Sequence, residues 1–222
     1  MSVNPLPNES PEYRKIREEL LQAEIALKDQ VGKVAALRRR LPTDTSIEDA
    51  IFEEVRNGET VAVRLSELFE DPSKPLLLMH FMHGKKQQNP CPMCTLWADG
   101  YNALMGHLNQ RVNFAVLVAG DLLSFLDYGR GRGWNQLRVV SAADSDLKLR
   151  LGFESPEGDQ YPGISVFRLD AGQLFHFTSS SAMMGEGHFN GMDQLSPFWH
   201  FLDMTPEGRE DFFPKTNYEV SS

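Results

Sequence analysis

The sequence predicts an α/β fold, in which helices sandwich a mixed central sheet and a long helix extends from the N-terminal side. Three observations support this prediction. Two strand-sized apolar runs, 75–82 and 112–119, flank a helical pattern; two strand patterns within 163–179 are separated by a turn; and residues 10–41 have the pattern of one helix. Short apolar runs of this kind are typical of strands covered on both faces.

The N-terminal helix is predicted from its caps and its apolar stripe. Ser10 is a suitable N-cap before Pro11, and Leu41-Pro42 ends the pattern. Residues 10–41 include 8 basic and 5 acidic side chains, so this segment carries +3 and the rest of the chain −12. The stripe is suited either to packing on the chain's own core or to a homodimer through this helix. It consists of Ile16, Leu20, Ala23, Leu27, Val34, Leu37 and Leu41, with Gln30 on the same line.

Strand and helix patterns alternate through the rest of the chain. We predict strands at 59–65, 75–82, 112–119 and 136–141, and helical segments at 66–71, 92–109 and 122–129, the last capped by Asp121. A short helix begins at Asp144 or Ser145, the 163–179 hairpin turns at residues 170–172, and a final helix over 192–204 bends at Pro197. The expected organisation is a helical arm (1–45), a main domain (46–205) and a tail (206–222).

Composition narrows the partners and the compartment. With 22 basic and 31 acidic residues the formal charge is −9, which argues against nucleic acid or an anionic membrane as the main partner. We find no apolar run of membrane-spanning length and no apolar core of a secretory signal in residues 1–15. The two cysteines stand too close together to staple the fold, so the cytoplasm is the expected compartment.

The two cysteines form a Cys-Pro-Met-Cys motif where the 92–109 helix begins. Pro92 is a favourable first helical residue, which makes Cys91 the N-cap, beside free N–H groups and the positive end of the helix dipole. Both features favour a thiolate. Cys94 lies one turn further on the same side, at a spacing that permits a disulfide. We therefore expect Cys91 to be exposed and to attack, and Cys94 to be more buried and to resolve the mixed disulfide.

A second element is expected to approach the cysteines. Tyr161-Pro162 directly precedes the hairpin, and an aromatic–Pro bond at such a turn is a candidate for cis geometry, with an ordinary trans bond as the alternative. We expect this turn, together with Pro92 and Met93, to contact an extended substrate. Trp97 is expected to be a core or cleft-wall aromatic that contributes to the same surface.

Several segments together resemble thioredoxin-fold proteins. These are PLLLMHF (75–81), CPMC (91–94) at the head of a helix, and YPGISVFRLDAGQLF (161–175); residues 61–84 further resemble the entry into the peroxiredoxin-like branch. Over residues 10–210 the chain resembles an uncharacterised bacterial thioredoxin-like family of predicted dithiol-disulfide isomerases. The matching motifs are RRRLP (38–42), HFMHG (80–84), CPMC with WADG (91–100), GRGRGW (129–134) and FLDMTPEGR (201–209).

The resemblance implies a thioredoxin-like fold and dithiol chemistry at Cys91 and Cys94. The expected partners are a protein or small-molecule disulfide or thiol and a reductant of unknown identity, and no cofactor is expected. The tryptophan that precedes the cysteine pair in thioredoxins is absent, because Asn89-Pro90 stand there and Trp97 comes after the pair. This departure bears on protein-disulfide turnover more than on the fold.

Two alternatives involve other chemistry. A peroxiredoxin-type nucleophile requires proline seven residues before it and Thr or Ser three before, whereas Gly84 and Gln88 hold these positions relative to Cys91. Peroxidase activity is therefore disfavoured. The glycine-rich GRGRG segment carries Arg130 and Arg132, which are either loop charges or an anion site near the cysteines.

Two further alternatives remain open. His80, His83, Cys91 and Cys94 give four candidate zinc ligands, but strand alternation points the two histidines to opposite faces, so no metal site is expected. The other alternative is a non-catalytic binding or redox-sensing protein, because a fold does not by itself establish an activity. A thiol–disulfide oxidoreductase is the favoured interpretation.

Overall fold

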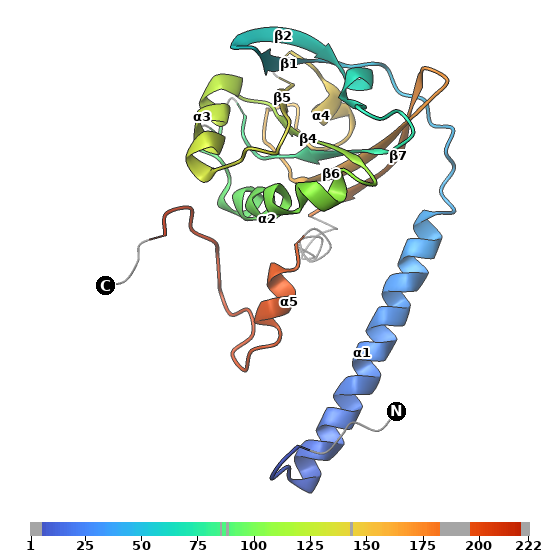
Figure 1. The fold of residues 1–222 in the computed structure, drawn as a ribbon, viewed down its shortest axis with the longest axis vertical. Coiled ribbons are helices and arrows are strands. Elements are labelled where there is room, and N and C mark those ends of the chain that lie inside the picture. The colour runs from blue at the N-terminus through green and yellow to red at the C-terminus, as the bar shows by residue number, and fades with distance from the viewer. Residues whose placement is uncertain (1–5, 85, 88, 143, 183–195, 219–222) are drawn as a thin grey trace. The chain divides into compact units, whose positions relative to one another are not determined.

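The computed structural model describes residues 6–84, 86–87, 89–142, 144–182 and 196–218. The chain divides into two compact units, Met1–Pro42 and Thr43–Ser222 (Figure 1). The first unit contains one helix, and the second contains the sheet with its covering helices. Among the described residues, no helix combines the length and the apolar character needed to cross a membrane.

The helix of the first unit, α1 (Pro11–Arg38), begins as predicted. The Ser10 hydroxyl accepts a hydrogen bond from the N–H of Tyr13 at 3.1 Å, and Pro11 occupies the first turn. The helix ends at Arg38, slightly before the predicted Leu41. No residue of α1 is buried, so its apolar stripe is left uncovered within this unit.

Three parallel strands form the centre of the sheet in the second unit. They are β3 (Leu76–His80), β4 (Asn113–Val118) and β5 (Val139–Ser141), connected by α2 (Pro92–Leu108) and α3 (Leu122–Arg132). Every residue of β4 is buried, as an apolar run between two layers predicts. The Asp121 carboxylate caps α3 as predicted, accepting from the N–H of Ser124 at 2.6 Å. Because β3 and β4 are parallel, the segments that follow them emerge at the same edge of the sheet.

Two antiparallel hairpins complete a seven-stranded mixed sheet of order β2-β1-β5-β4-β3-β6-β7. β6 (Gly163–Asp170) and β7 (Gln173–Ser181) form the predicted closing hairpin, which turns at Ala171-Gly172. β1 (Ile51–Arg56) was not predicted. It pairs with β2 (Glu59–Arg64) through Asn57-Gly58, both at positive φ, and this Asn-Gly dipeptide is a hairpin signal that could have revealed it. The βαβ unit followed by an antiparallel hairpin confirms the predicted thioredoxin-like α/β fold with a long N-terminal helix.

The short helices correct several predictions. Residues Leu65–Leu68 form a single 3-10 turn (η1), and α4 (Leu147–Arg150) begins later than expected. The last helix, α5 (Phe198–Leu202), starts after Pro197 instead of bending there, and the predicted part at 192–195 lies outside the described residues. Arg130 and Arg132 were expected in a glycine-rich loop, but they occupy the last turn of α3, which Gly133 ends at φ 77°.

The sheet separates two apolar clusters. Leu76 and Leu78 of β3 contribute to the cluster under η1 and α4, whereas Met79 and the following Phe81 contribute to the cluster under α2, α3 and α5. This alternation follows from the period of two residues along a strand. Both cysteines belong to the second cluster, on the face of the sheet that α2 covers. Figure 1 shows α2 lying against this face.

Candidate active site

The cysteines lie at the start of α2, directly beyond the C-terminal end of β3. Cys91 is the N-cap residue in an extended conformation, and Pro92 occupies the first helical turn, as predicted. The N–H of Cys91 donates to the carbonyl of Met82 at 3.3 Å, which ties the helix start to the end of the strand. Both sulfurs are free thiols. Cys91 is only 8% exposed and Cys94 is fully buried, so Cys91 is the more accessible of the two but less exposed than expected.

The environment of Cys91 favours its thiolate. The pKa of Cys91 is lowered to about 6. The largest cause is the thiol of Cys94, which donates a hydrogen bond to the Cys91 sulfur. Burial raises the pKa, whereas the backbone N–H groups of Cys94 and Met93 lower it further. The Cys91 side chain closes no cap hydrogen bond with the first turn. The amides therefore act chiefly as oriented dipoles at a helix N-terminus.

The environment of Cys94 has the opposite effect. Burial raises the pKa of Cys94 well above its usual range, and the neighbouring Cys91 raises it further. The backbone N–H of Met82 and the charge of Lys148 lower it in part. At neutral pH the pair therefore holds one thiolate, on Cys91, and one proton, on Cys94.

Buried polar side chains lie beneath the motif. Lys148 of α4 is fully buried, and its Nζ donates to the carbonyl of Phe81 at 3.0 Å. His80 stacks on Phe153 with ring centroids 3.8 Å apart, and its Nε2 lies 2.8 Å from the Ser165 hydroxyl. Burial lowers the pKa of His80 well below its usual range, so its imidazole is neutral. Lys148 therefore supplies the positive charge at this position.

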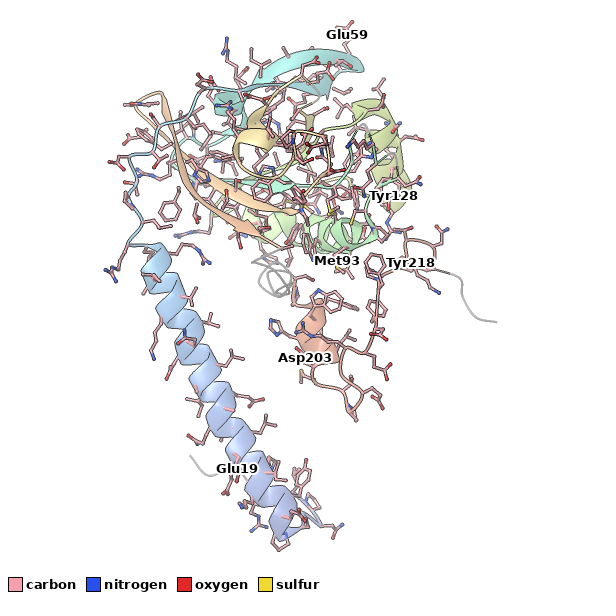
Figure 2. The ribbon with its side chains drawn as sticks, turned by 180° about the vertical axis from the view of Figure 1, so that it is seen from behind. Glu19, Glu59, Met93, Tyr128, Asp203 and Tyr218 are labelled. Atoms are coloured by element: carbon pink, nitrogen blue, oxygen red, sulfur yellow. The ribbon has the colours of Figure 1, made fainter. Side chains whose placement is uncertain are left out.

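A polar contact anchors the outer side of α2. The Thr95 hydroxyl lies 2.9 Å from both the carbonyl of Cys91 and the phenol oxygen of Tyr128 on α3. Figure 2 shows Met93, Tyr128 and Tyr218 along this side of the second unit. A groove of about 1180 Å³ runs past Pro92 and Thr95, and its other wall includes Phe198 and residues 212–218.

The remaining residues that were predicted to contact a substrate, Tyr161, Pro162 and Trp97, differ in how deeply they are buried. Tyr161 is half-buried and Pro162 is buried at the start of β6, where the carbonyl of Pro162 accepts from the N–H of Ala182 at 3.1 Å. Every peptide bond among the described residues is trans, including Tyr161–Pro162, so the cis alternative is not adopted. Trp97 is 1% exposed and belongs to the core, not to a cleft wall.

The zinc alternative finds no matching geometry. His80 is turned toward Phe153 and Ser165, while His83 packs against Gly120, whose missing side chain leaves room for the imidazole. In the described part of the chain, no group of three or more His, Cys, Asp or Glu side chains is arranged to hold a metal ion. The two histidines therefore act as buried neighbours of the motif.

Several site residues carry no local signal in the sequence. Lys148 lies in a Leu-Lys-Leu-Arg segment, where nothing indicates that the lysine is buried. Asp99, in the WADG segment, accepts from the guanidinium of Arg132 and from the indole N–H of Trp134 at 2.7 Å. Arg132 in turn donates to the phenol of Tyr218 at 2.7 Å, which joins the C-terminal segment to α3. These contacts depend on the tertiary arrangement of α2 and α3.

Comparison with solved structures returns thioredoxin-superfamily proteins at low similarity. Oxidized Prx3 from Vibrio vulnificus is 16% identical over 67% of this chain and 92% of its own, with a TM-score of 0.48. The mitochondrial 2-Cys peroxiredoxin from Plasmodium falciparum is 14% identical over 69% and 93%, with a TM-score of 0.47. The exposed lipoprotein thioredoxin from Streptococcus pneumoniae is 16% identical over 66% and 100%, with a TM-score of 0.41. The fold follows from the strand order, not from these likenesses.

A search of curated proteins finds no match. A family described as bacterial protein of unknown function (DUF899) matches residues 3–221, which is nearly the whole chain. The chain therefore belongs to this bacterial family, DUF899.

Proposed function

We propose that the protein is a thiol–disulfide oxidoreductase in which Cys91 attacks and Cys94 resolves. The Cys91 thiolate attacks a client disulfide, forms a mixed disulfide and releases the first client thiolate. Cys94 then attacks the Cys91 sulfur, and the second client thiolate leaves with the proton that Cys94 gives up. The client disulfide is reduced by two electrons, the Cys91–Cys94 disulfide forms, and a thiol reductant restores the dithiol.

The single observation that carries this proposal is the opposite perturbation of two neighbouring sulfurs. The pKa of Cys91 is lowered to about 6, while that of Cys94 is raised. A nucleophile needs the thiolate form at working pH, and a resolving cysteine should stay protonated until the mixed disulfide has formed. Strongly perturbed titrating pairs concentrate at functional sites, which supports catalysis over a purely structural role.

The proposed client surface surrounds the start of α2. Pro92 lines the groove along α2, and Met93, in the first turn, is 8% exposed. Tyr161 and Pro162, at the start of β6, remain proposed contacts for an extended client. Trp97 would support this surface from below, because its side chain is buried. The client is proposed to be a protein or small-molecule disulfide.

A trapping experiment tests the assignment of roles. Cys94→Ser should retain its client as a stable mixed disulfide on Cys91, because no second thiol remains to release it. Cys91→Ser is the matched control and should trap no client, because the remaining Cys94 is fully buried and protonated. Client disulfides should be identified by mass spectrometry after non-reducing purification.

The outcome also separates the alternatives. Trapping on Cys91 with turnover of a model disulfide supports the oxidoreductase. Reversible Cys91–Cys94 oxidation without turnover would favour a redox sensor, and consumption of hydrogen peroxide without disulfide turnover would favour a peroxidase. A dithiol that a thiol reductant must restore after each turnover is suited to a reducing compartment, and we propose the cytoplasm.

We further propose that α1 joins two copies of the chain. Its stripe repeats at alternating spacings of four and three residues, as in a coiled-coil seam, yet no residue of α1 is buried. Residues 28–40 contain 5 basic and 1 acidic side chains, whereas 11–27 contain 4 acidic and 3 basic ones. An antiparallel arrangement brings the basic half of each helix against the acidic half of the partner. It also places Leu27 of one copy opposite Gln30 of the other.

A further inference from the structure

Beneath the cysteines, Met82 is the central residue of a tight turn that ends β3. The carbonyl of Phe81 accepts from the N–H of His83 at 3.1 Å and closes this turn. The backbone of Met82 meets both cysteines: its carbonyl accepts from the N–H of Cys91 at 3.3 Å, and its N–H donates to the sulfur of Cys94. A group that fixes the Phe81–Met82 peptide therefore fixes the N–H that donates to the Cys94 sulfur.

Lys148 is such a group. It is fully buried, and its Nζ reaches from α4 to donate to the Phe81 carbonyl at 3.0 Å. That carbonyl and the N–H of Met82 belong to the same planar peptide unit. An ammonium on the oxygen side polarises the peptide and strengthens the N–H on the other side as a donor toward Cys94.

The charged and titratable groups around Lys148 leave it as the cation. Burial lowers the pKa of Lys148 to about 8, and Cys94 on α2 and Glu154 raise it in part. Burial also lowers the pKa values of His80 and His83, and the charge of Lys148 lowers both further. At neutral pH Lys148 is therefore protonated while the two imidazoles beside it are neutral.

We propose that Lys148 is a positioning residue for the resolving cysteine: it fixes the Phe81–Met82 peptide against the Cys94 sulfur and stabilises the thiolate that Cys94 becomes. This inference rests on the proposed function. During resolution the Cys94 thiol gives up its proton, its sulfur bonds to that of Cys91, the bond from Cys91 to the client breaks, and the departing thiolate takes up the proton. Lys148 keeps its own proton throughout.

The two steps can be separated with an aromatic disulfide that releases a coloured nitrobenzoate thiolate. Attack by Cys91 releases the first thiolate, and resolution by Cys94 releases the second. The chain has no other cysteine, so both releases report on this pair. Lys148→Met should leave the first release unchanged, because the groups that set the pKa of Cys91 do not include Lys148. The second release should slow about tenfold at neutral pH, with its pH midpoint displaced upward by about one unit.

Lys74→Met provides a matched control. The Nζ of Lys74 also donates to a backbone carbonyl at 3.0 Å, that of Asn109, but Lys74 lies two residues before the start of β3, at the end of the strand away from the cysteines. Losing this lysine should leave the pH midpoint of the second release at its wild-type value. A purely structural effect of Lys148→Met would lower stability or slow both releases without moving that midpoint.

Glu154→Gln tests the same inference if Lys148→Met does not fold. Glu154 helps to hold the proton on Lys148, so its loss should slow the second release around pH 8 and leave it unchanged around pH 6. A wild-type pH profile in every folded variant overturns the role of Lys148. Absence of a second release from the wild-type protein would instead overturn the dithiol function itself.

Discussion

Thr95 lies one helical turn after Cys91, and its hydroxyl is 2.9 Å from the hydroxyl of Tyr128. This contact ties α2 to α3. The same hydroxyl donates to the carbonyl of Cys91 at 2.9 Å. Thr95 is 1% exposed, so both contacts are made away from bulk water. The start of α2 is thus held from outside by Thr95 and from beneath by Met82.

Thr95→Val should destabilise the fold. Valine keeps the shape but removes the hydroxyl, which leaves the phenol of Tyr128 without its partner in this contact, and we expect a loss of about 1–2 kcal/mol in the free energy of unfolding. Urea denaturation followed by circular dichroism measures this loss. Thr60→Val is the control, because Thr60 is exposed on β2, and it should change stability by less than about 0.5 kcal/mol.

The reactivity of Cys91 should follow the hydrogen bond from Cys94. In the wild-type protein, alkylation by iodoacetamide should rise through a midpoint near pH 6, because the thiolate forms above the lowered pKa of Cys91. Cys94→Ala removes the hydrogen-bond donor that contributes most to that low pKa and should displace the midpoint upward by about one to two pH units. Cys94→Ser retains a donor and should give a smaller displacement. Equal midpoints in the alanine variant and the wild type would contradict this account of the thiolate.

Asp99→Asn should loosen the C-terminal segment. Asp99 pairs with Arg132, and Arg132 also donates to the carbonyl of Thr216 at 2.8 Å and to the phenol of Tyr218. Removing the charge leaves a mostly buried guanidinium without its counter-ion, for which we expect a loss of about 1–3 kcal/mol. Limited proteolysis should then cut within residues 203–218 more rapidly than in the wild-type protein.

The control for Asp99 lies on α3. Asp127 forms an exposed pair with Arg130 at 3.0 Å, and both side chains are more than two-thirds exposed. Asp127→Asn should therefore change stability by less than about 0.5 kcal/mol and leave the proteolysis pattern unchanged. Equal effects of the two substitutions would show that the Asp99 pair does not hold the segment.

The sequence predicts best where one local pattern determines the structure. The sequence correctly predicts the strand β3, the start of α2 at Pro92 and the Asp121 cap, because apolar runs and caps act over a few residues. β1 escaped prediction because its buried Glu54 looks like a surface residue. Its carboxylate is held by the guanidinium of Arg138 at 2.7 Å, 84 residues away.

Within the site, the motif was predictable but its surroundings were not. The position of Cys91 as N-cap follows from Pro92 alone. The burial of Cys91 and of Lys148 depends on packing between α2, α4 and the end of β3, and no periodicity in their own segments reports it. The contact of Lys148 with Phe81 spans 67 positions.

Leu27→Asp should disrupt the proposed dimer. Leu27 lies on the stripe of α1 and is 61% exposed within the single chain, so a charge there costs little until a second copy covers it. Ile25→Asp is the matched control, because Ile25 is 46% exposed but lies off the stripe. Sedimentation equilibrium should show a dimer for the wild type and for Ile25→Asp, and a monomer for Leu27→Asp.

A charge exchange then tests the antiparallel orientation. In that arrangement Glu19 of one copy lies beside Arg40 of the other, two residues past the end of α1, whereas in a parallel pair Glu19 would lie beside Glu24. Arg40→Glu should therefore weaken the dimer, and adding Glu19→Arg should restore it, because the opposite charges are re-formed in exchanged positions. Failure of the second substitution to restore association would argue for a parallel pair, and a monomeric wild-type protein would exclude the dimer altogether.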